Sequence, residues 1–315
     1  MQAPFVNPIE SAPRAHLSRL FDEEATLWTQ GLLWSFAPTR KRLEAALDDG
    51  VLNGFVASDP HGICAYATYA SDGEHGIVGS LFAAPRCRTL GIEALLARHV
   101  LDRLFMEEPR VIDCQTLFSS DPGLTEPFTV RGFVSAKRLY MTLERAAWFR
   151  ARRDNPPGFR SKPTHRTDLR SMARLIYEAH VESHGLDASS SFDTLESCER
   201  ILRQIILDEV CGPFDSYGSR RVEQGGRIVA ASLLTWPLPE VAHISEVATT
   251  PSHRRLGLAR RCITETLTHA FETGQATAAT LSVTASNHAA VALYESLGFV
   301  PHVRYGSHVR RGARR

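Results

Sequence analysis

The sequence predicts a mixed α/β protein in which two similar domains follow one another, each a mixed sheet covered by helices. Its 315 residues suit two domains of ordinary size better than one small core. One set of residues recurs at a fixed, domain-sized offset. Strand-like segments are clustered between helix-like ones, which is typical of a sheet with helices on both faces.

The repeat has an offset of 166 residues. Pro251, Arg254 and Gly257 in "PSHRRLG" have identical residues at that distance upstream, in "PRCRTLG" (85–91). The dipeptide Gly298-Phe299 recurs upstream in the same register. Because chance matches would drift in spacing, a register held across separated elements indicates a duplicated domain.

The second copy has a readable order of elements. "RIVAASLL" and "TLSVTA" have the β-branched character of strands, and "LARRCITETLTHAF" places apolar residues at helical spacing. "SFDTLESCERI" begins with a helix-capping signal. The expected elements are helices at 168–183, 193–209, 257–273 and 288–296, and strands at 215–223, 227–236, 241–250 and 279–285, with short strands near 299–310.

The repeat also predicts the domain boundaries. Residues 1–145 form the first domain and residues 166–315 the second. Between them, 146–165 is rich in Pro, Gly and Arg, as expected of a linker.

Composition excludes several classes of protein. The net charge of +1 does not imply a nucleic-acid or membrane partner. The start has no apolar signal region, and no apolar run approaches membrane-spanning length. The six cysteines are scattered without a CxxC pair, which indicates reduced core thiols in a cytoplasmic protein and no metal site.

The stretch "EVATTPSHRRLGLA" (246–259) joins a strand to a helix through small and basic residues. The first amides of a helix are unpaired and carry the positive end of its dipole, so they favour an anion. Gly257 and Ala259 would let those amides approach a ligand closely, and Arg254 and Arg255 add charged donors. The pattern indicates a diphosphate cradle, although a strand–helix turn that prefers small residues would explain the short motif as well.

The second copy resembles the GNAT superfamily of N-acetyltransferases. "RRLGLA" (254–259) matches the family's Arg/Gln-x-x-Gly-x-Gly/Ala loop, and "NHAAVALYESLGF" (287–299) matches its downstream Asn, Tyr and Gly-Phe pattern. The resemblance covers roughly 165–310 well and 15–145 more faintly. It implies two tandem GNAT-like domains and acetyl-CoA as co-substrate. The residues it assigns to acetyl-CoA binding are Val247, Ala248, Thr249, Arg254, Arg255, Leu256, Gly257, Leu258, Ala259 and Asn287.

The same resemblance gives Tyr294 a catalytic role. It matches the family tyrosine that protonates the departing CoA thiolate, a step that needs a placed O–H donor. The alternative is a helix aromatic with its hydroxyl at the surface. Asn287 is either a contact to pantetheine or a plain helix N-cap.

The base that deprotonates the acceptor ammonium has two candidates, His243 and Glu246. Histidine has the better intrinsic pKa for this role, so His243 ranks slightly higher. Three residues apart on a strand, the two face opposite sides unless a bulge intervenes, as it often does in this family.

The first copy has lost the residues that this chemistry needs. Glu93 stands at the position of Ala259, where a carboxylate would repel a diphosphate by about 1–3 kcal/mol per charge pair. Phe128 replaces Tyr294, and Asp121 replaces Asn287. The first copy is therefore expected to keep the fold without catalysis.

The sequence thus predicts an acetyl-CoA-dependent N-acetyltransferase that acetylates a primary amine of a small molecule by direct attack in a ternary complex. The alternatives are a peptide or protein N-terminal acetyltransferase and a non-catalytic acyl-CoA binding or sensing protein. The acceptor cannot be read from the sequence, and a homodimer is left open.

Overall fold

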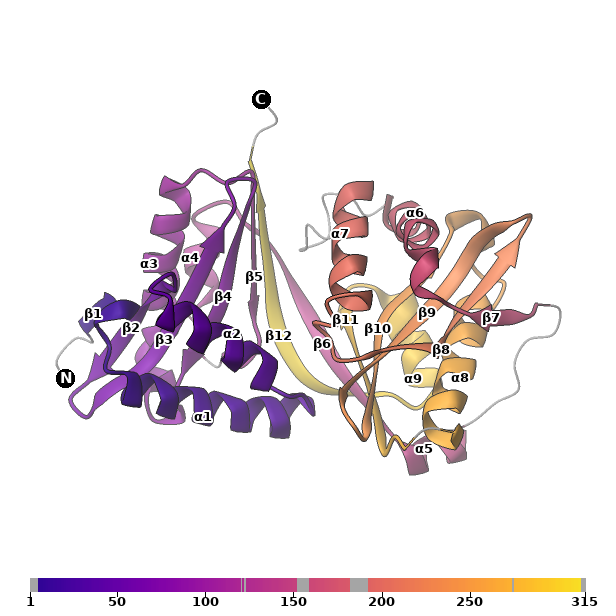
Figure 1. The fold of residues 1–315 in the computed structure, drawn as a ribbon, viewed down its shortest axis with the longest axis horizontal. Helices are drawn as coiled ribbons and strands as arrows, with labels where there is room; N and C mark the ends of the chain where they lie inside the picture. The colour runs from indigo at the N-terminus through magenta and orange to yellow at the C-terminus, as the bar shows by residue number, and fades with distance from the viewer. Residues whose placement is uncertain are drawn as a thin grey trace. The chain divides into compact units, whose positions relative to one another are not determined.

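The computed structural model describes residues 5–119, 121, 123–151, 159–181, 192–273 and 275–312. The chain forms two compact units (Figure 1). Unit 1 comprises Met1–Lys137 and Arg304–Arg315, and unit 2 comprises Arg138–Val303.

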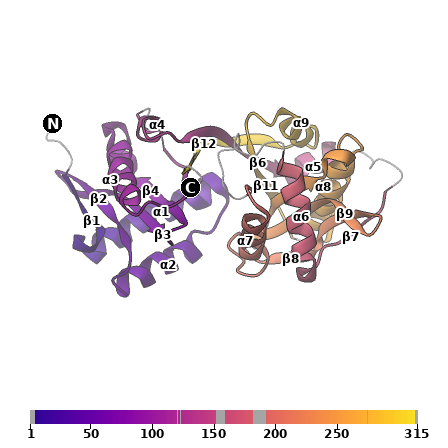
Figure 2. The same cartoon turned by 90° about the horizontal axis from the view of Figure 1, so that it is seen from above.

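Unit 1 is a mixed sheet with helices on both faces. Its strands follow the order β1-β2-β3-β4-β5-β12, with α3 on one face and α1 and α2 on the other (Figure 2). The elements of the first copy in chain order are β1 (Phe5–Pro8), α1 (Arg14–Leu32), α2 (Ala37–Asp48), β2 (Asn53–Asp59), β3 (Gly62–Ser71), β4 (His75–Ala83), α3 (Ile92–Met106), β5 (Val111–Thr116), α4 (Thr125–Thr129) and β6 (Val134–Glu144), which passes into unit 2 after Lys137.

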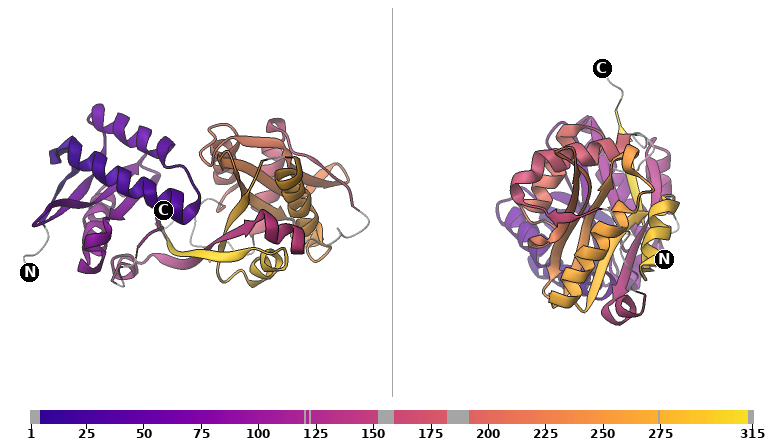
Figure 3. Two further views of the ribbon diagram at one scale, coloured as in Figure 1. Left: turned by 90° about the horizontal axis from the view of Figure 1, so that it is seen from below. Right: turned by 90° about the vertical axis from the view of Figure 1, so that its right-hand side faces the viewer.

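Unit 2 repeats this plan. Its strands follow the order β6-β11-β10-β9-β8-β7, with α6 and α7 on one face and α8 on the other (Figure 3). The elements are α5 (Arg145–Ala151), β7 (Ser161–Pro163), α6 (Leu169–His180), α7 (Leu195–Ile206), β8 (Phe214–Gln224), β9 (Arg227–Leu238), β10 (Val241–Thr249), α8 (Leu258–Thr268), β11 (Ala278–Thr284), α9 (His288–Ser296) and β12 (Val300–Arg311).

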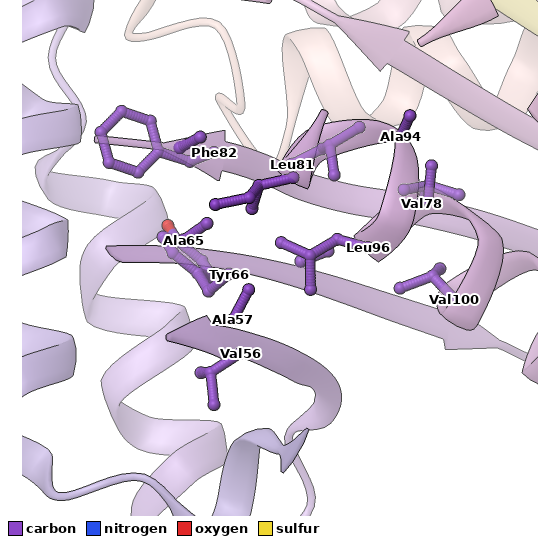
Figure 4. Close-up of a cluster of buried hydrophobic side chains, with 14 of the residues drawn as sticks. Val56, Ala57, Ala65, Tyr66, Val78, Leu81, Phe82, Ala94, Leu96 and Val100 are labelled. Atoms are coloured by element: carbon purple, nitrogen blue, oxygen red, sulfur yellow. The ribbon is translucent and has the colours of Figure 1, made fainter. Parts of the chain in front are cut away.

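Apolar residues at the periods of strands and helices build the cores. In unit 1, Leu96 and Val100 of α3 pack with Val56 of β2 and Leu81 of β4 (Figure 4). In unit 2, one cluster joins α6 and α7 to the sheet, and another joins α8 and α9 to the opposite face. The sheet of unit 2 is therefore covered on both sides, as the clustering of strand-like segments between helix-like ones had predicted.

The two copies exchange their last strands. Residues Arg138–Glu144 of β6 pair antiparallel with β11 in unit 2, whereas Gly306–Arg311 of β12 pair antiparallel with β5 in unit 1. The units divide after Lys137 and after Val303, two positions separated by the repeat offset of 166. Each unit is thus completed by the equivalent strand of the other copy.

The compact units therefore differ from the ranges 1–145 and 166–315 expected from the sequence, because each copy contributes its last strand to the other unit. The range 146–165, expected to be a linker, includes secondary structure. It contains α5, whose Trp148 is fully buried in a core of unit 2, and strand β7, which pairs with β8. Residues 152–158 of the linker lie outside the described part of the chain.

The predicted elements of the second copy are otherwise present within a few residues. Helix 288–296 has the bounds of α9. The helix expected at 257–273 is α8 followed by a π-helical turn at His269–Thr273. The short strands expected near 299–310 are one continuous strand, β12, because β5 supplies a partner for its second half.

The six cysteines are free. All but Cys211 are buried, as their apolar surroundings in the sequence suggested. Among the described helices, none is both long and apolar enough to cross a membrane.

The strand exchange predicts which unit is destabilised by a core mutation in β6. Met141 is fully buried in a core of unit 2, and a large-to-small change there should cost about 2–5 kcal/mol. We expect Met141→Ala to raise hydrogen exchange in β11, its pairing partner, more than in β5. Hydrogen-exchange mass spectrometry measures both strands, and faster exchange in β5 than in β11 would contradict the assignment of β6 to unit 2.

Candidate functional site

Strands β10 and β11 separate part-way along their length. They pair in parallel only from Val241 to Ile244 on β10 and from Ala278 to Leu281 on β11. On its other side β10 stays paired with β9 as far as Thr249. Beyond Ile244, one edge of β10 therefore has no β11 partner, and its backbone groups there are available to a ligand.

A β-bulge lies where the strands separate. Ile244 pairs with Leu234 and Glu246 with Leu233, so Ser245 is the extra residue of β10. Side chains would alternate without the bulge, but with it His243 and Glu246 face the same side, that of α6 and α7. The bulge on which the sequence argument depended is present.

The open edge carries three of the residues expected at the cofactor. Val247 packs toward the core under α8 and α9, and Ala248 is buried in the core under α6 and α7. The hydroxyl of Thr249 is buried and has no hydrogen-bond partner among the described residues. A buried polar group without a partner is costly, so a ligand hydrogen bond at Thr249 would relieve that cost.

Helix α8 begins directly after this strand and a short loop. Its N-cap, Gly257, has a φ of 78° and no side-chain hydrogen bond caps the helix. Arg255 also has a positive φ, of 67°, which costs of order 1–3 kcal/mol for a residue other than glycine. The loop thus turns sharply, and no side chain among the described residues accepts from the first amides of α8. A helix terminus of this kind favours an anion.

The side chains of this loop differ in their surroundings. Arg255 and Leu256 are exposed, Ala259 is half-buried, and Leu258 is buried in the core. Arg254 donates through Nη2 to the carbonyl oxygen of Ala179, 2.7 Å away. This contact lies in the last turn of α6, where cations are favoured. Arg254 therefore holds the loop against α6.

Tyr294 lies on α9 and is buried. Its ring meets Phe299 edge-on, with centroids 6.1 Å apart. Burial raises the pKa of Tyr294 well above its ordinary value, the carboxylate of Glu246 adds to the increase, and Arg138 opposes it. The phenol therefore stays protonated at neutral pH and can donate a proton or a hydrogen bond.

Asn287 caps α9. Its Oδ1 accepts a hydrogen bond from the amide of Ala290 at 3.2 Å. Its side chain is exposed. The plain N-cap that the sequence left as one alternative is therefore present, and a contact to pantetheine stays a prediction.

His243 is buried, and its environment makes it a weak base. Its Nδ1 is hydrogen-bonded to Thr280 Oγ1 at 2.9 Å, and its ring stacks with Tyr140 at a centroid distance of 6.2 Å. Burial lowers the pKa of His243 to about 3. The imidazole is thus neutral across the physiological range but has little affinity for a proton.

Glu246 is better placed to accept one. It lies opposite α6, with its Oε1 3.9 Å from Nε2 of His180, and His180 stacks on Phe192 at 4.2 Å. Because Glu246 also influences Tyr294, it lies at the gap between β10 and β11. Both residues stay predicted bases, and their environments differ: His243 is buried in the sheet, whereas Glu246 lies on the part of β10 that β11 does not pair with.

In unit 1 the corresponding helix terminus is filled by the chain itself. The carboxylate of Asp121 accepts the amide of Ala94 in the first turn of α3, at 3.2 Å. Glu93 is buried and accepts a hydrogen bond from Ser119 at 2.6 Å. Burial raises the pKa of Glu93. The anion position of the first copy is thus occupied by carboxylates of the protein.

The position of Tyr294 is also closed in unit 1. Phe128 is fully buried and stacks on His308 of β12, with ring centroids 4.0 Å apart. This ring has no proton to donate, which agrees with the loss of catalysis predicted for the first copy.

Three side chains that act on the predicted site residues were not singled out from the sequence. Arg138 influences Tyr294, Tyr140 stacks with His243, and His180 lies beside Glu246. Arg138 and Tyr140 lie in the first copy's last strand, and nothing local indicates that this strand enters the other unit. The repeat gave a partial signal, since β6 aligns with β12 at the offset of 166.

Residues 176–299 match the model of the acetyltransferase (GNAT) family. No curated protein matches the sequence. Among solved structures, a tandem GNAT protein from the clavulanic acid biosynthesis pathway is 15% identical, with a TM-score of 0.54 over 99% of this chain and 100% of that one. A GCN5-related N-acetyltransferase from Sphaerobacter thermophilus is 16% identical, with a TM-score of 0.62 over 98% and 95%. These likenesses show the fold, and the predicted pair of GNAT-like domains is confirmed.

Proposed function

We propose that this chain, a tandem GNAT protein whose residues 176–299 match the acetyltransferase family, transfers the acetyl group of acetyl-CoA to a primary amine of a small molecule. Transfer takes place in unit 2, by direct attack of the amine in a ternary complex. The absence of a disulfide among the described cysteines is compatible with a cytoplasmic location.

One observation carries the proposal. The open edge of β10 continues into a helix whose first amides no side chain caps. An extended arm with amide groups fits the edge, and a diphosphate fits the helix terminus. The unpartnered hydroxyl of Thr249 lies between these two regions. Acetyl-CoA has a thioester, an amide-bearing arm and a diphosphate in that order.

The chemistry needs proton transfers and one charged centre. Glu246 takes the proton of the acceptor ammonium, and the free amine attacks the thioester carbonyl. Backbone amides of Val247 to Thr249 stabilise the oxyanion that develops on that carbonyl. Tyr294 then donates its phenolic proton to the departing thiolate. The nitrogen of the adduct gives up its remaining extra proton as the amide forms, and that proton restores the phenol.

Direct transfer is favoured over an acetyl-cysteine intermediate. Cys198 is the thiol that Glu246 influences, and burial raises its pKa to about 12. Burial likewise raises the pKa of Cys262 to about 12. Thiols in these environments stay protonated and are poor nucleophiles.

The proposal is tested by incubating purified protein with acetyl-CoA and a panel of primary amines while free CoA thiol is measured. Turnover of at least one amine above the hydrolysis background is expected. Binding of acetyl-CoA without turnover of any small amine or peptide would instead indicate a sensing protein.

The comparison of the two copies predicts the effect of Ala259→Glu, which introduces into unit 2 the carboxylate that unit 1 has at Glu93. Repulsion of about 1–3 kcal/mol per charge pair should weaken acetyl-CoA binding roughly tenfold to hundredfold. Calorimetry should give one site for the wild type and a weaker site for the variant. Glu93→Ala is the matched control and should change neither affinity nor stoichiometry, so two equivalent sites in the wild type would refute the assignment.

Tyr294→Phe tests the acid. Because the hydroxyl acts on the leaving thiolate, kcat should fall about 10- to 1000-fold, while calorimetry should show nearly unchanged acetyl-CoA affinity. Tyr217, which is exposed on β8, supplies the control Tyr217→Phe. If single-turnover rates of Tyr294→Phe equal those of the wild type, Tyr294 is a structural aromatic.

The pH profile separates the two candidate bases. The pKa of His243 is about 3, so this imidazole stays neutral from pH 5 to 9 and does not titrate there. We expect His243→Gln to keep the shape of the kcat/KM profile in this range, because this imidazole does not change charge there, and Glu246→Gln to lower kcat/KM more strongly. A changed profile in His243→Gln alone would identify His243 as the base.

A further inference from the structure

We propose that Arg138, which strand exchange carries from the first copy into unit 2, binds an anionic group of the acceptor, so that the acceptor is an amine that also bears a carboxylate. This inference rests on the acetyl transfer proposed above and names the substrate class of the same site.

The position of Arg138 on β6 sets the direction of its side chain. Leu139 and Met141 pack into the core under α8 and α9, so Arg138 and Tyr140 face the other side of the sheet. That is the side of His243 and Glu246, and the stacking of Tyr140 on His243 agrees with it.

The guanidinium of Arg138 has unused donors. Its Nη2 donates to Oγ of Ser282 at 3.4 Å, a long hydrogen bond, and its Nε is buried without a partner. Within the described part of the chain, no carboxylate forms an ion pair with it. Burial of an unpaired guanidinium donor is unfavourable, and a carboxylate that accepts two parallel N–H bonds is the ligand that best matches this group.

Opposite charges flank the proposed acid. The pKa of Tyr294 is raised by Glu246 and lowered by Arg138, so both charged groups lie within electrostatic reach of its phenol. An acceptor with an ammonium and a nearby carboxylate fits between them, with its nitrogen at Glu246 and its carboxylate at Arg138. A simple amine would satisfy only Glu246.

The repeat offers a matched control. Arg304 occupies the equivalent position on β12 at the offset of 166, but it is exposed and belongs to unit 1, in which Phe128 replaces the tyrosine. Arg304→Gln removes the same charge from the chain without touching the proposed acceptor site.

The experiment compares matched pairs of acceptors that differ by one carboxylate, such as phenylalanine and phenethylamine, or glycine and methylamine. Released CoA thiol gives kcat/KM for wild type, Arg138→Gln, Arg138→Lys and Arg304→Gln. We expect the wild type to prefer the carboxylated member about 10- to 100-fold, in line with a charged hydrogen-bonded pair. Arg138→Gln should remove most of that preference, chiefly by raising the KM of the carboxylated member. Arg138→Lys should keep part of the preference, and Arg304→Gln all of it.

Three outcomes overturn the inference. Equal use of both members by the wild type refutes it and leaves acetyl transfer standing. Weaker acetyl-CoA binding by Arg138→Gln in calorimetry, at unchanged Tm, would make Arg138 a cofactor contact. Bound acetyl-CoA with no turnover of any amine refutes the proposed function itself, and the inference with it.

Discussion

The candidate site of unit 2 depends on the early end of the pairing between β10 and β11, after Ile244 and Leu281. The bulge at Ser245 ends it, and the hydrogen bond of 2.7 Å between the hydroxyls of Ser245 and Thr235 fixes the bulge on β9. An unpaired strand edge invites association with another chain, so a protein that leaves one inside a fold must fill it. A ligand that supplies amide groups satisfies the same donors and acceptors that β11 leaves unpaired beyond Ile244.

The same opening exists in unit 1, so the gap alone does not make an active site. There β4 and β5 pair only from His75 to Val78 and from Val111 to Cys114. The copies differ in the chemistry placed around the gap. Asp121 puts a negative charge at the amides of α3, whereas α8 has no such cap. Under the proposed function, the charge at one helix terminus therefore decides which copy accepts the diphosphate.

The parts of the structure that were readable from the sequence are those fixed by neighbouring residues. Gly257 marks a helix start because its positive φ suits glycine, and Asn287 marks another through its capping oxygen. The environment of His243 was not readable, because Thr280 and Tyr140 reach it from other strands. The pKa of a histidine depends on its burial, and the residues that bury this one are distant in the sequence. The exchange of strands was hidden for the same reason, since the partners of both last strands lie far away in the sequence.

Strand exchange gives a physical reason why a copy without catalytic residues persists. Unit 2 obtains Leu139, Met141 and Leu143 of its core from the first copy, and β11 has its antiparallel partner there. A chain reduced to the second copy would lose these apolar contacts and expose the edge of β11. Residue 138 is the first residue of unit 2, so the strand that completes the fold is also the one that carries Arg138 to the acceptor side. The stability of the second copy is therefore encoded partly in the first, and under the proposed function so is the choice of acceptor.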